Sequence, residues 1–255
     1  MQVDGSVALI TGGASGLGFG AASRVVANGG SVGLLDLNEE RGEVAAEQLD
    51  RTSFFPCDVA NPDDVAAAVR AVSEAFGKID VLVNAAGIAP ASRLIARDGT
   101  PHDLGIFART IEINLIGMFD VIRTVAGVMA DNQPNEEGER GVIVNVASIA
   151  AFDCQIGQAA YSASKGGIVG MTLPLARDLA SIGVRCMTVA PGIMDTPLLA
   201  SAPQELKDSL AQLAAFPKRL GTPDDFARLV IAIVENPMLN GEVIRLDAAA
   251  RMPPK

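Results

Sequence analysis

The sequence is poor in the residue types on which many active sites depend. It has no tryptophan, one tyrosine (Tyr161) and one histidine (His102) in 255 residues. A single histidine excludes metal sites built from histidine clusters and argues against a Ser-His-Asp hydrolase. The three cysteines, Cys57, Cys154 and Cys186, are odd in number and lack CxxC spacing. They indicate neither a disulfide framework nor a zinc site, and we interpret them as small buried hydrophobes.

Positive charge and long apolar runs are also scarce. Twenty Lys and Arg residues against 30 Asp and Glu residues give a formal net charge of −10. This balance argues against nucleic acid and anionic membranes as main partners. We find no apolar run of transmembrane length, and residues 1–4 lead into a predicted strand without a signal peptide. We therefore expect a soluble, reduced protein of the cytoplasm, with no metal.

What the sequence does contain is a regular alternation of apolar runs and helical patterns. Hydrophobic residues make up 49% and aromatic residues 4%, so the core must consist of Val, Ile, Leu and Ala. Four strand–helix units within about 90 residues predict a doubly wound parallel sheet. We expect one domain over 1–255, an α/β Rossmann-type fold with about seven strands and helices on both faces. The predicted strands are 6–11, 31–35, 53–56, 79–83, 142–146, 184–190 and 242–246.

The first predicted strand ends in a glycine-rich turn, residues 11–18 (TGGASGLG), which precedes a helix. Gly12, Gly16 and Gly18 allow a sharp turn and a close approach to phosphate, with helix N–H groups facing the anion. Their spacing differs from GxGxxG, and Phe19 stands where a P-loop requires lysine. Alone, the turn is either a nucleotide-binding turn or a plain tight turn.

An acid, Asp36, follows the second predicted strand, about 20 residues beyond the glycines. A carboxylate there accepts hydrogen bonds from an adenosine ribose and repels a 2′-phosphate. No Lys or Arg follows until Arg41. The alternative is that Asp36 caps the helix predicted over 38–49.

The later predicted strands also end in polar or small residues. In parallel sheets, ligands bind at the carboxyl ends of the strands, so these residues are candidates for one site. They are Asp58 and Val59, the run 84–87 (NAAG), Ser148, and the pair Pro191 and Gly192.

Tyr161 and Lys165 are four positions apart on a helix predicted from 158, so they share a face about 5–6 Å apart. A free tyrosine has a pKa of about 10, and acid–base work near neutral pH requires lowering it by roughly 2–3. A cation about 4 Å away supplies roughly 1 kcal/mol in water but roughly 4 at a dielectric near 20. The pair therefore works only in a cleft that excludes water; otherwise it belongs to an ordinary amphipathic helix.

The same helix continues through Gly166, Gly167 and Gly170 to about residue 181, with Pro174 inside it. Three glycines cost roughly 3 kcal/mol in helix propensity. This predicts close packing against that face or, alternatively, a kink at Pro174.

Three further segments stand out by composition. Residues 92–108 form an irregular surface excursion, and 131–141 form an acidic loop with no core residue. Residues 193–222 form a long apolar-rich connection that we interpret as a substrate lid. Asn114 lies within a helix predicted over 107–129, where it either faces solvent or joins a buried network.

Taken together, these motifs resemble the short-chain dehydrogenase/reductase family, in the family's order and over essentially the whole chain. Segments 140–180 and 237–252 look closest to its type-2 3-hydroxyacyl-CoA dehydrogenases. The motifs that carry the resemblance are residues 11–18, Asp36, Asp58-Val59, 84–87, Asn114, Ser148, Tyr161-x3-Lys165, and Pro191-Gly192 with Thr196.

The resemblance implies NAD-dependent oxidation of a secondary alcohol by a homotetramer. It makes Tyr161 the general base, and Lys165 the residue that lowers its pKa and holds the nicotinamide ribose. Ser148 would hydrogen-bond the substrate oxygen, and Asn114 would fix a proton-relay water.

It also implies a cofactor half over about 1–147 and a catalytic half over about 148–255. Ala248 departs from the family pattern, which usually has glycine there, and this puts the local turn in question. The implied cofactor-binding residues are Gly12, Ser15, Gly16, Leu17, Gly18, Asp36, Asp58, Val59, Asn84, Ala85, Gly87, Tyr161, Lys165, Pro191, Met194 and Thr196.

Three functions stay open from the sequence. The first is a 3-hydroxyacyl-CoA dehydrogenase, with branched or steroid alcohols as further substrates. The second is a dehydrogenase for a neutral alcohol or polyol, and the third is a non-catalytic NAD-binding protein, against which the complete catalytic set counts. Two basic pairs, Arg93 with Arg97 and Lys218 with Arg219, either hold the CoA phosphates or are solvated surface charge.

Overall fold

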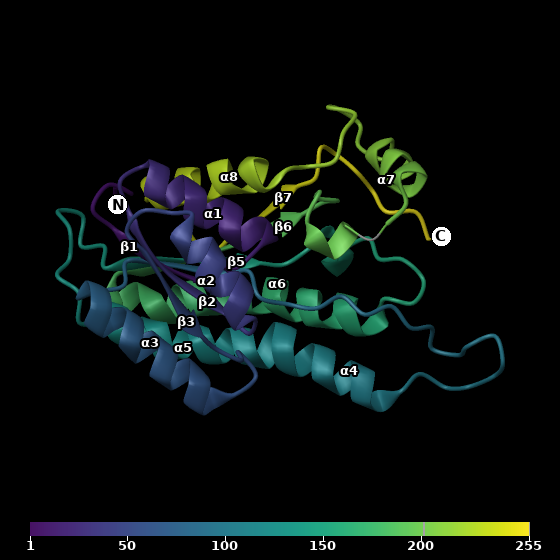
Figure 1. Cartoon of the computed structure of the whole chain (residues 1–255), viewed down its shortest axis with the longest axis horizontal. Helices are drawn as coiled ribbons and strands as arrows, with labels where there is room; N and C mark the ends of the chain where they lie inside the picture. The colour runs from purple at the N-terminus through teal and green to yellow at the C-terminus, as the bar shows by residue number, and fades with distance from the viewer. Residues whose placement is uncertain (201, 255) are drawn as a thin grey trace.

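The computed structural model describes residues 1–200 and 202–254, and its centre is a seven-stranded parallel sheet (Figure 1). The strand order is β3-β2-β1-β4-β5-β6-β7, which reverses direction between β1 and β4, the place where such sheets bind ligands. The predicted doubly wound α/β fold is confirmed. The strands are β1 (Val7–Thr11), β2 (Ser31–Asp36), β3 (Thr52–Pro56), β4 (Val81–Asn84), β5 (Gly141–Val146), β6 (Val184–Pro191) and β7 (Val243–Leu246).

Helices cover both faces of the sheet, and this explains the unbroken apolar runs of the strands. Every residue of β1, β4, β5 and β6 is buried, as expected for strands packed on two sides. One face carries α1 (Gly16–Ala27), α2 (Glu39–Glu47) and α8 (Pro223–Glu235). The other carries α3 (Pro62–Phe76), α5 (Met118–Ala130) and α6 (Ala159–Leu179).

The helix predicted over 107–129 is longer than expected and is not uniform. It begins with α4 (Leu104–Ile111), whose N-terminus is capped by the Asp103 carboxylate, and passes through a π-helical turn, Glu112–Gly117, into α5. A Cβ on Gly117 would lie 2.5 Å from the Val59 carbonyl oxygen, so only glycine fits there. A π turn inserts one residue into the helical register and often marks a functional site.

This continuous helix, Leu104–Ala130, also has the length and composition of a membrane span, contrary to the expectation that no apolar run reaches that length. Half of its most apolar stretch is buried inside the fold. Helix α5 packs against α3, and α4 packs against α6, so the apolar side chains contribute to the core.

The acidic loop 131–141 differs from the prediction, because one of its residues does lie in the interior. Glu139 is buried, and its Oε1 accepts a hydrogen bond from Arg185 Nε at 2.6 Å. The Arg185 guanidinium also donates to backbone carbonyls at the end of α8, including Ile233 at 2.9 Å. A buried pair of this kind is tolerated because its remaining hydrogen-bonding capacity is used.

Helix α6 runs without interruption through Pro174, so the glycines do not mark a helix break. Gly167 is packed as expected, since a Cβ there would lie 2.7 Å from a methyl group of Leu115. Gly166 and Gly170, in contrast, face open space within the described chain. The expected close packing is therefore confirmed for Gly167 alone.

Candidate active site

A cleft of about 780 Å³ opens at the carboxyl ends of the strands, where the sequence motifs converge. Its volume lies within the range typical of small-molecule sites. Every predicted cofactor residue except Asn84 lines it, together with Ser148. The lining residues that were predicted are Gly12, Ser15, Gly16, Leu17, Gly18, Asp36, Asp58, Val59, Ala85, Gly87, Ser148, Tyr161, Lys165, Pro191, Met194 and Thr196.

The glycine-rich turn forms the floor of the cleft at the N-terminus of α1. Gly12 has φ +64°, and a Cβ on it would lie 2.8 Å from the backbone nitrogen of Ala86. The two turns after β1 and β4 therefore touch through their backbones. Gly16, the first residue of α1, has φ +55°. A helix N-terminus at this place directs its free N–H groups toward an anion, so the turn fits a pyrophosphate.

Asp36 is the last residue of β2 and lines the cleft. One carboxylate oxygen accepts a hydrogen bond from Ala14 N at 3.2 Å, and the other accepts from Asn38 N at 3.1 Å. The cap of α2 is Asn38, whose side chain accepts from Arg41 N, so the capping alternative for Asp36 is wrong. The side chain of Arg41 also lines the cleft.

Asn84 is the one predicted cofactor residue that the structure places elsewhere. It is buried in β4, and its Nδ2 donates to Asn145 Oδ1 in β5 at 3.0 Å. Its Oδ1 has no hydrogen-bond partner within the described chain. Asn84 is not among the residues that line the cleft, and the contact that it makes joins β4 to β5, so its part in cofactor binding stays a prediction.

Asn114 lies on the π turn and belongs to a buried network rather than to the surface. Its Oδ1 accepts from Ile88 N at 2.8 Å, and its Nδ2 donates to Ile88 O at 2.8 Å and to Ser164 Oγ at 3.1 Å. A Cβ on Gly87 would lie 3.0 Å from the same Oδ1. The amide thus clamps the turn after β4 against α6, next to the residues that face the cleft.

Ser148 and Lys165 are held by short, specific contacts on either side of Tyr161. Ser148 caps a 3₁₀ turn, Ile149–Ala151, and its Oγ accepts from Ala150 N at 3.1 Å. Lys165 is 4% exposed, and its Nζ donates to the Val146 carbonyl oxygen at 2.8 Å. Burial lowers the pKa of Lys165 to about 8. Its ammonium nitrogen lies 5.7 Å from the centroid of the Tyr161 ring.

The electrostatics of Tyr161 differ from what its spacing to Lys165 predicts. Burial raises the pKa of the Tyr161 phenol, and a hydrogen bond with Ser148 acts in the opposite direction. The expected lowering by Lys165 does not dominate, because burial of the phenol is the largest influence and the ammonium donates to the Val146 carbonyl oxygen. Ser148, rather than Lys165, is therefore the group that favours the phenolate in this geometry.

Comparison with known proteins agrees with this geometry. A model of the family described as short chain dehydrogenase matches residues 6–207. The chain belongs to the short-chain dehydrogenase family. It is therefore an oxidoreductase that uses a nicotinamide cofactor, which excludes the third of the three functions left open by the sequence.

Full-length relatives of the family are also found. The human protein named 3-hydroxyacyl-CoA dehydrogenase type-2 is 56% identical, over 99% of this chain and 98% of its own. A Mycobacterium avium structure of the same name has a TM-score of 0.93 and 43% identity, covering 98% of each chain. A 3-ketoacyl-(acyl-carrier-protein) reductase from Brucella melitensis, complexed with NADH, has a TM-score of 0.87 and 30% identity, covering 98% of this chain and 100% of its own.

Sequence reasoning missed several residues that line the dehydrogenase cleft. Arg109 is one of them, and it donates to Glu112 at 2.8 Å and to Asp58 at 3.4 Å. The spacing from Arg109 to Glu112 is visible in the sequence, but nothing local indicates the bond to Asp58. Gln158 is another, and its Oε1 accepts from the thiol of Cys154 at 3.5 Å.

The cysteines mostly follow the prediction. Cys57 and Cys186 are buried, and burial raises the pKa of both thiols to about 12, so they remain inert hydrophobes. Cys154 is partly exposed beside Gln158. All three are free thiols.

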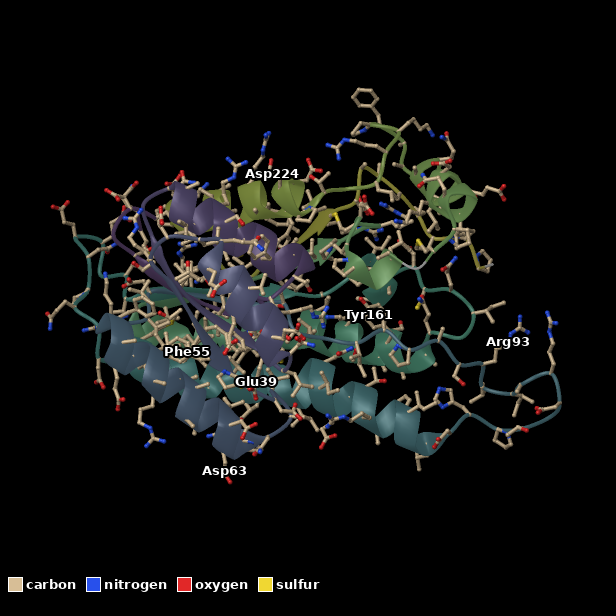
Figure 2. All side chains as sticks on the ribbon, viewed as in Figure 1. Glu39, Phe55, Asp63, Arg93, Tyr161 and Asp224 are labelled. Carbon is tan, nitrogen blue, oxygen red and sulfur yellow. The ribbon has the colours of Figure 1, made fainter. Side chains whose placement is uncertain are left out.

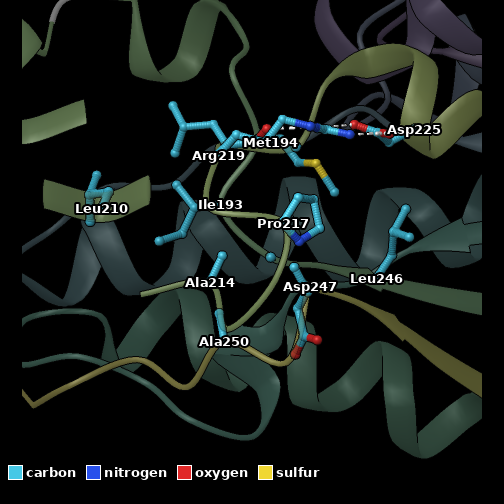
Figure 3. A pocket seen from close by; sticks show the side chains of 14 residues that line it. Ile193, Met194, Leu210, Ala214, Pro217, Arg219, Asp225, Leu246, Asp247 and Ala250 are labelled. Carbon is cyan, nitrogen blue, oxygen red and sulfur yellow. Dashed lines mark hydrogen bonds and ion pairs between the residues drawn. The ribbon is translucent and has the colours of Figure 1, made fainter. Parts of the chain in front are cut away.

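The predicted lid, 193–222, contains α7 (Gln204–Ala211), and its residue Ser201 lies outside the described residues. Between the lid and the end of β7 lies a second cavity of about 210 Å³ (Figure 3). Ile193 and Ala214 from the lid face Asp247 and Ala250 across it. Ala215 N also donates to the carbonyl oxygen of Ala248 at 2.8 Å, so the lid is joined to the chain after β7.

The turn at Ala248, which the sequence left in question, is retained without glycine. Ala248 has φ +50° and Ala249 has φ +59°, both in the left-handed region. A Cβ in this region costs roughly 1–2 kcal/mol per residue. The turn therefore persists at the expense of local backbone strain.

Proposed function

We propose that this dehydrogenase is an NAD-dependent 3-hydroxyacyl-CoA dehydrogenase, which interconverts 3-hydroxyacyl-CoA and 3-oxoacyl-CoA. The main support is that Ser148, Tyr161 and Lys165 line one cleft with the glycine-rich turn and Asp36. The full-length similarity to proteins of that name supports the substrate class.

The cleft fits a dinucleotide along its whole length. Glycines with positive φ stand where a pyrophosphate needs close backbone approach, and an acid stands where a ribose needs an acceptor. Asp58 and Val59 lie where an adenine would be enclosed. When bound, the nicotinamide accepts a hydride from the alcohol carbon. We assign NAD rather than NADP because the Asp36 carboxylate would lie beside a 2′-phosphate.

The chain itself supplies proton transfer and orientation. The Oγ of Ser148 accepts from Ala150 N, and its single hydroxyl proton, which is shared with Tyr161 in this structure, would turn to the substrate oxygen. The phenolate of Tyr161 then takes the hydroxyl proton as general base. Lys165, buried and bound to Val146 O, carries a positive charge near the phenol and would hold the nicotinamide ribose.

A proton relay at Asn114 is constrained by its contacts. Both protons of its amide group are used, by Ile88 O and Ser164 Oγ. A water held by Asn114 must therefore donate to one of its oxygens, of which Oδ1 already accepts from Ile88 N. The relay function of Asn114 remains a proposal.

The two basic pairs that could bind the CoA phosphates, Arg93 with Arg97 and Lys218 with Arg219, differ in whether their charges are already paired. Arg219 forms a bidentate pair with Asp225, at 2.6 and 2.9 Å, and Lys218 Nζ donates to the carbonyl oxygen of Gln212. Arg93 and Arg97 are exposed and take part in no ion pair with another described residue. Their charges are therefore available to a phosphate.

Arg93 lies on an arm, residues 89–103, at one end of the molecule (Figure 2). Arg97 belongs to the same arm. The base of the arm contacts the loop that leads into the helix of Tyr161, because Ser92 N donates to Gly157 O at 2.7 Å. We therefore assign the CoA phosphates to Arg93 and Arg97.

A turnover panel tests the substrate class. Wild-type protein with NAD should give its highest kcat/KM on a short or medium 3-hydroxyacyl-CoA. Changing both Arg93 and Arg97 to Glu should raise the KM for the thioester about tenfold and leave the KM for a CoA-free alcohol unchanged. Lys218→Glu is the matched control and should leave both KM values unchanged. If the kcat/KM for simple alcohols or steroids exceeds that for every thioester, the enzyme is instead a dehydrogenase for neutral alcohols.

We further propose a homotetramer in the cytoplasm. Gly166 and Gly170 lie on α6, and no described residue lies within 4 Å of a Cβ built on either of them. Small residues allow a helix of a second copy to approach closely. Light scattering at micromolar concentration tests the assembly, and a mass near the 26.3 kDa of one chain would refute it. Fractionation of the source cells tests the location.

A further inference from the structure

Arg245, the third residue of β7, is held by segments that are far apart in the sequence. Its Nε donates to Asp247 Oδ2 at 2.8 Å, and its Nη2 donates to Asp153 Oδ2 at 2.5 Å. Nη2 also lies 3.3 Å from the carbonyl oxygen of Ala250, and the guanidinium carbon lies 5.1 Å from the centroid of the Phe152 ring. The side chain is 23% exposed, so these ion pairs are better protected from solvent than ordinary surface pairs.

The first segment that Arg245 holds is the loop 152–157, which leads directly into the helix of Tyr161. This loop has no helix or strand of its own. Besides the contacts of Asp153 and Phe152 with Arg245, Ile156 N donates to the carbonyl oxygen of Pro254 at 3.1 Å. The loop is therefore held from outside by Arg245 of β7, by the Pro254 carbonyl after β7, and by the bond from Ser92 N to Gly157 O.

The second segment is the turn after β7, which touches two other walls of the site. A Cβ on Gly192 would lie 2.9 Å from the Cα of Asp247, so this turn packs against the turn after β6. The hydrogen bond from Ala215 to Ala248 joins the same turn to the lid. Figure 3 shows Asp247 and Ala250 on the floor of the cavity that the lid covers.

We propose that Arg245 is a positioning residue that fixes the loop 152–157 and the lid against each other, and so sets where a substrate lies relative to Ser148 and Tyr161. The guanidinium bridges two carboxylates from different segments, which a neutral side chain of the same size cannot do. Loops without regular structure open at low energetic cost, so removing this bridge releases the loop before it affects the sheet.

Hydrogen exchange tests the proposal without any substrate. Arg245→Met keeps the apolar stem and removes the charge, and it should raise amide exchange in 152–157 and in the lid about tenfold, with β1 and α1 unchanged. Arg245→Lys should restore part of the protection. Arg251→Met is the matched control, because Arg251 approaches the same two carboxylates at 3.7 and 3.2 Å but is 59% exposed. Arg251→Met should change the rate of amide exchange in these segments less than about twofold.

Kinetics provide the second measurement, and they depend on the proposed function only through the choice of alcohol. With whichever alcohol the wild type oxidises best, Arg245→Met should lower kcat about tenfold and leave the dissociation constant for NADH within about twofold. Asp153→Asn removes the loop carboxylate that Arg245 and Arg251 share and leaves the Arg245–Asp247 pair in place. It should reproduce the loop exchange even if Arg245→Met fails to fold. Unchanged loop exchange in Asp153→Asn, exchange raised equally throughout the sheet, or an equal effect of Arg251→Met would overturn the proposal. A wild type inactive on thioesters would refute the substrate assignment alone, because the exchange result does not use one.

Discussion

The ammonium nitrogen of Lys165 lies 2.8 Å from the carbonyl oxygen of Val146, the last residue of β5. This bond joins the helix that carries Tyr161 to the strand that precedes Ser148, and so places both groups on one side of the cleft. It also buries a lysine with a single hydrogen-bond acceptor, which explains why the pKa of Lys165 is lowered to about 8. The buried ammonium of Lys165 therefore lowers the free energy of unfolding.

Lys165→Met should therefore abolish activity and stabilise the fold. The folded protein holds the Lys165 proton less tightly than the unfolded chain, since the pKa is about 8 rather than 10.5. The penalty is complete below pH 8 and disappears as the pH approaches 10.5. Allowing for the lost bond to Val146, we expect a gain of about 1–3 kcal/mol at pH 7. Urea unfolding at pH 7 and pH 10 measures it, and a variant less stable than wild type at both would contradict this account.

Tyr161→Phe should lower turnover by at least about a thousandfold and leave cofactor binding nearly unchanged, because the phenol acts on the substrate proton. In wild type, the raised pKa of Tyr161 means that the base form is scarce at neutral pH. Alcohol oxidation should accordingly increase with pH through pH 8, whereas ketone reduction, which uses the protonated phenol, should not. Activity within tenfold of wild type would exclude Tyr161 as the base.

Asp36→Arg should reduce or invert the preference for NAD. The wild-type carboxylate repels a 2′-phosphate, whereas an arginine attracts one, and Arg41 already lines the same part of the cleft. The ratio of kcat/KM for NAD and NADP with one alcohol measures the change. Equal values for the two cofactors in the wild-type enzyme would contradict the assignment. Asp58→Asn, at the adenine end, serves as a control that should not invert the ratio.

Ala248→Gly should stabilise the protein by about 1 kcal/mol, because glycine adopts a positive φ without steric cost. Part of this gain is offset by the greater freedom of glycine in the unfolded chain. Urea unfolding of the variant measures the difference, and Ala250→Gly, at a neighbouring residue without positive φ, is the matched control. Equal stability changes at both positions would show that strain at Ala248 is not the cause.

The sequence alone determined the fold and most of the cleft, because both depend on patterns that are local in the chain. Apolar strand runs alternating with helical periodicity specify a doubly wound sheet, and motifs at strand ends share one edge in any such sheet. The glycine turn, Asp36, and the spacing of Tyr161 and Lys165 are local patterns of this kind. The tertiary structure places them together in one cleft.

Only the tertiary structure decided the burial and pairing of the polar residues. Asn84 bonds Asn145 on the neighbouring strand, Asn114 occupies a π turn that propensity does not indicate, and the direction of the Tyr161 pKa shift follows from burial. Glu139 is paired with Arg185, 46 residues away, and Asp153 with Arg245, 92 residues away. Hydrogen bonds and charges act over a few ångströms in space, so their partners follow from how distant segments pack and not from the order of residues along the chain.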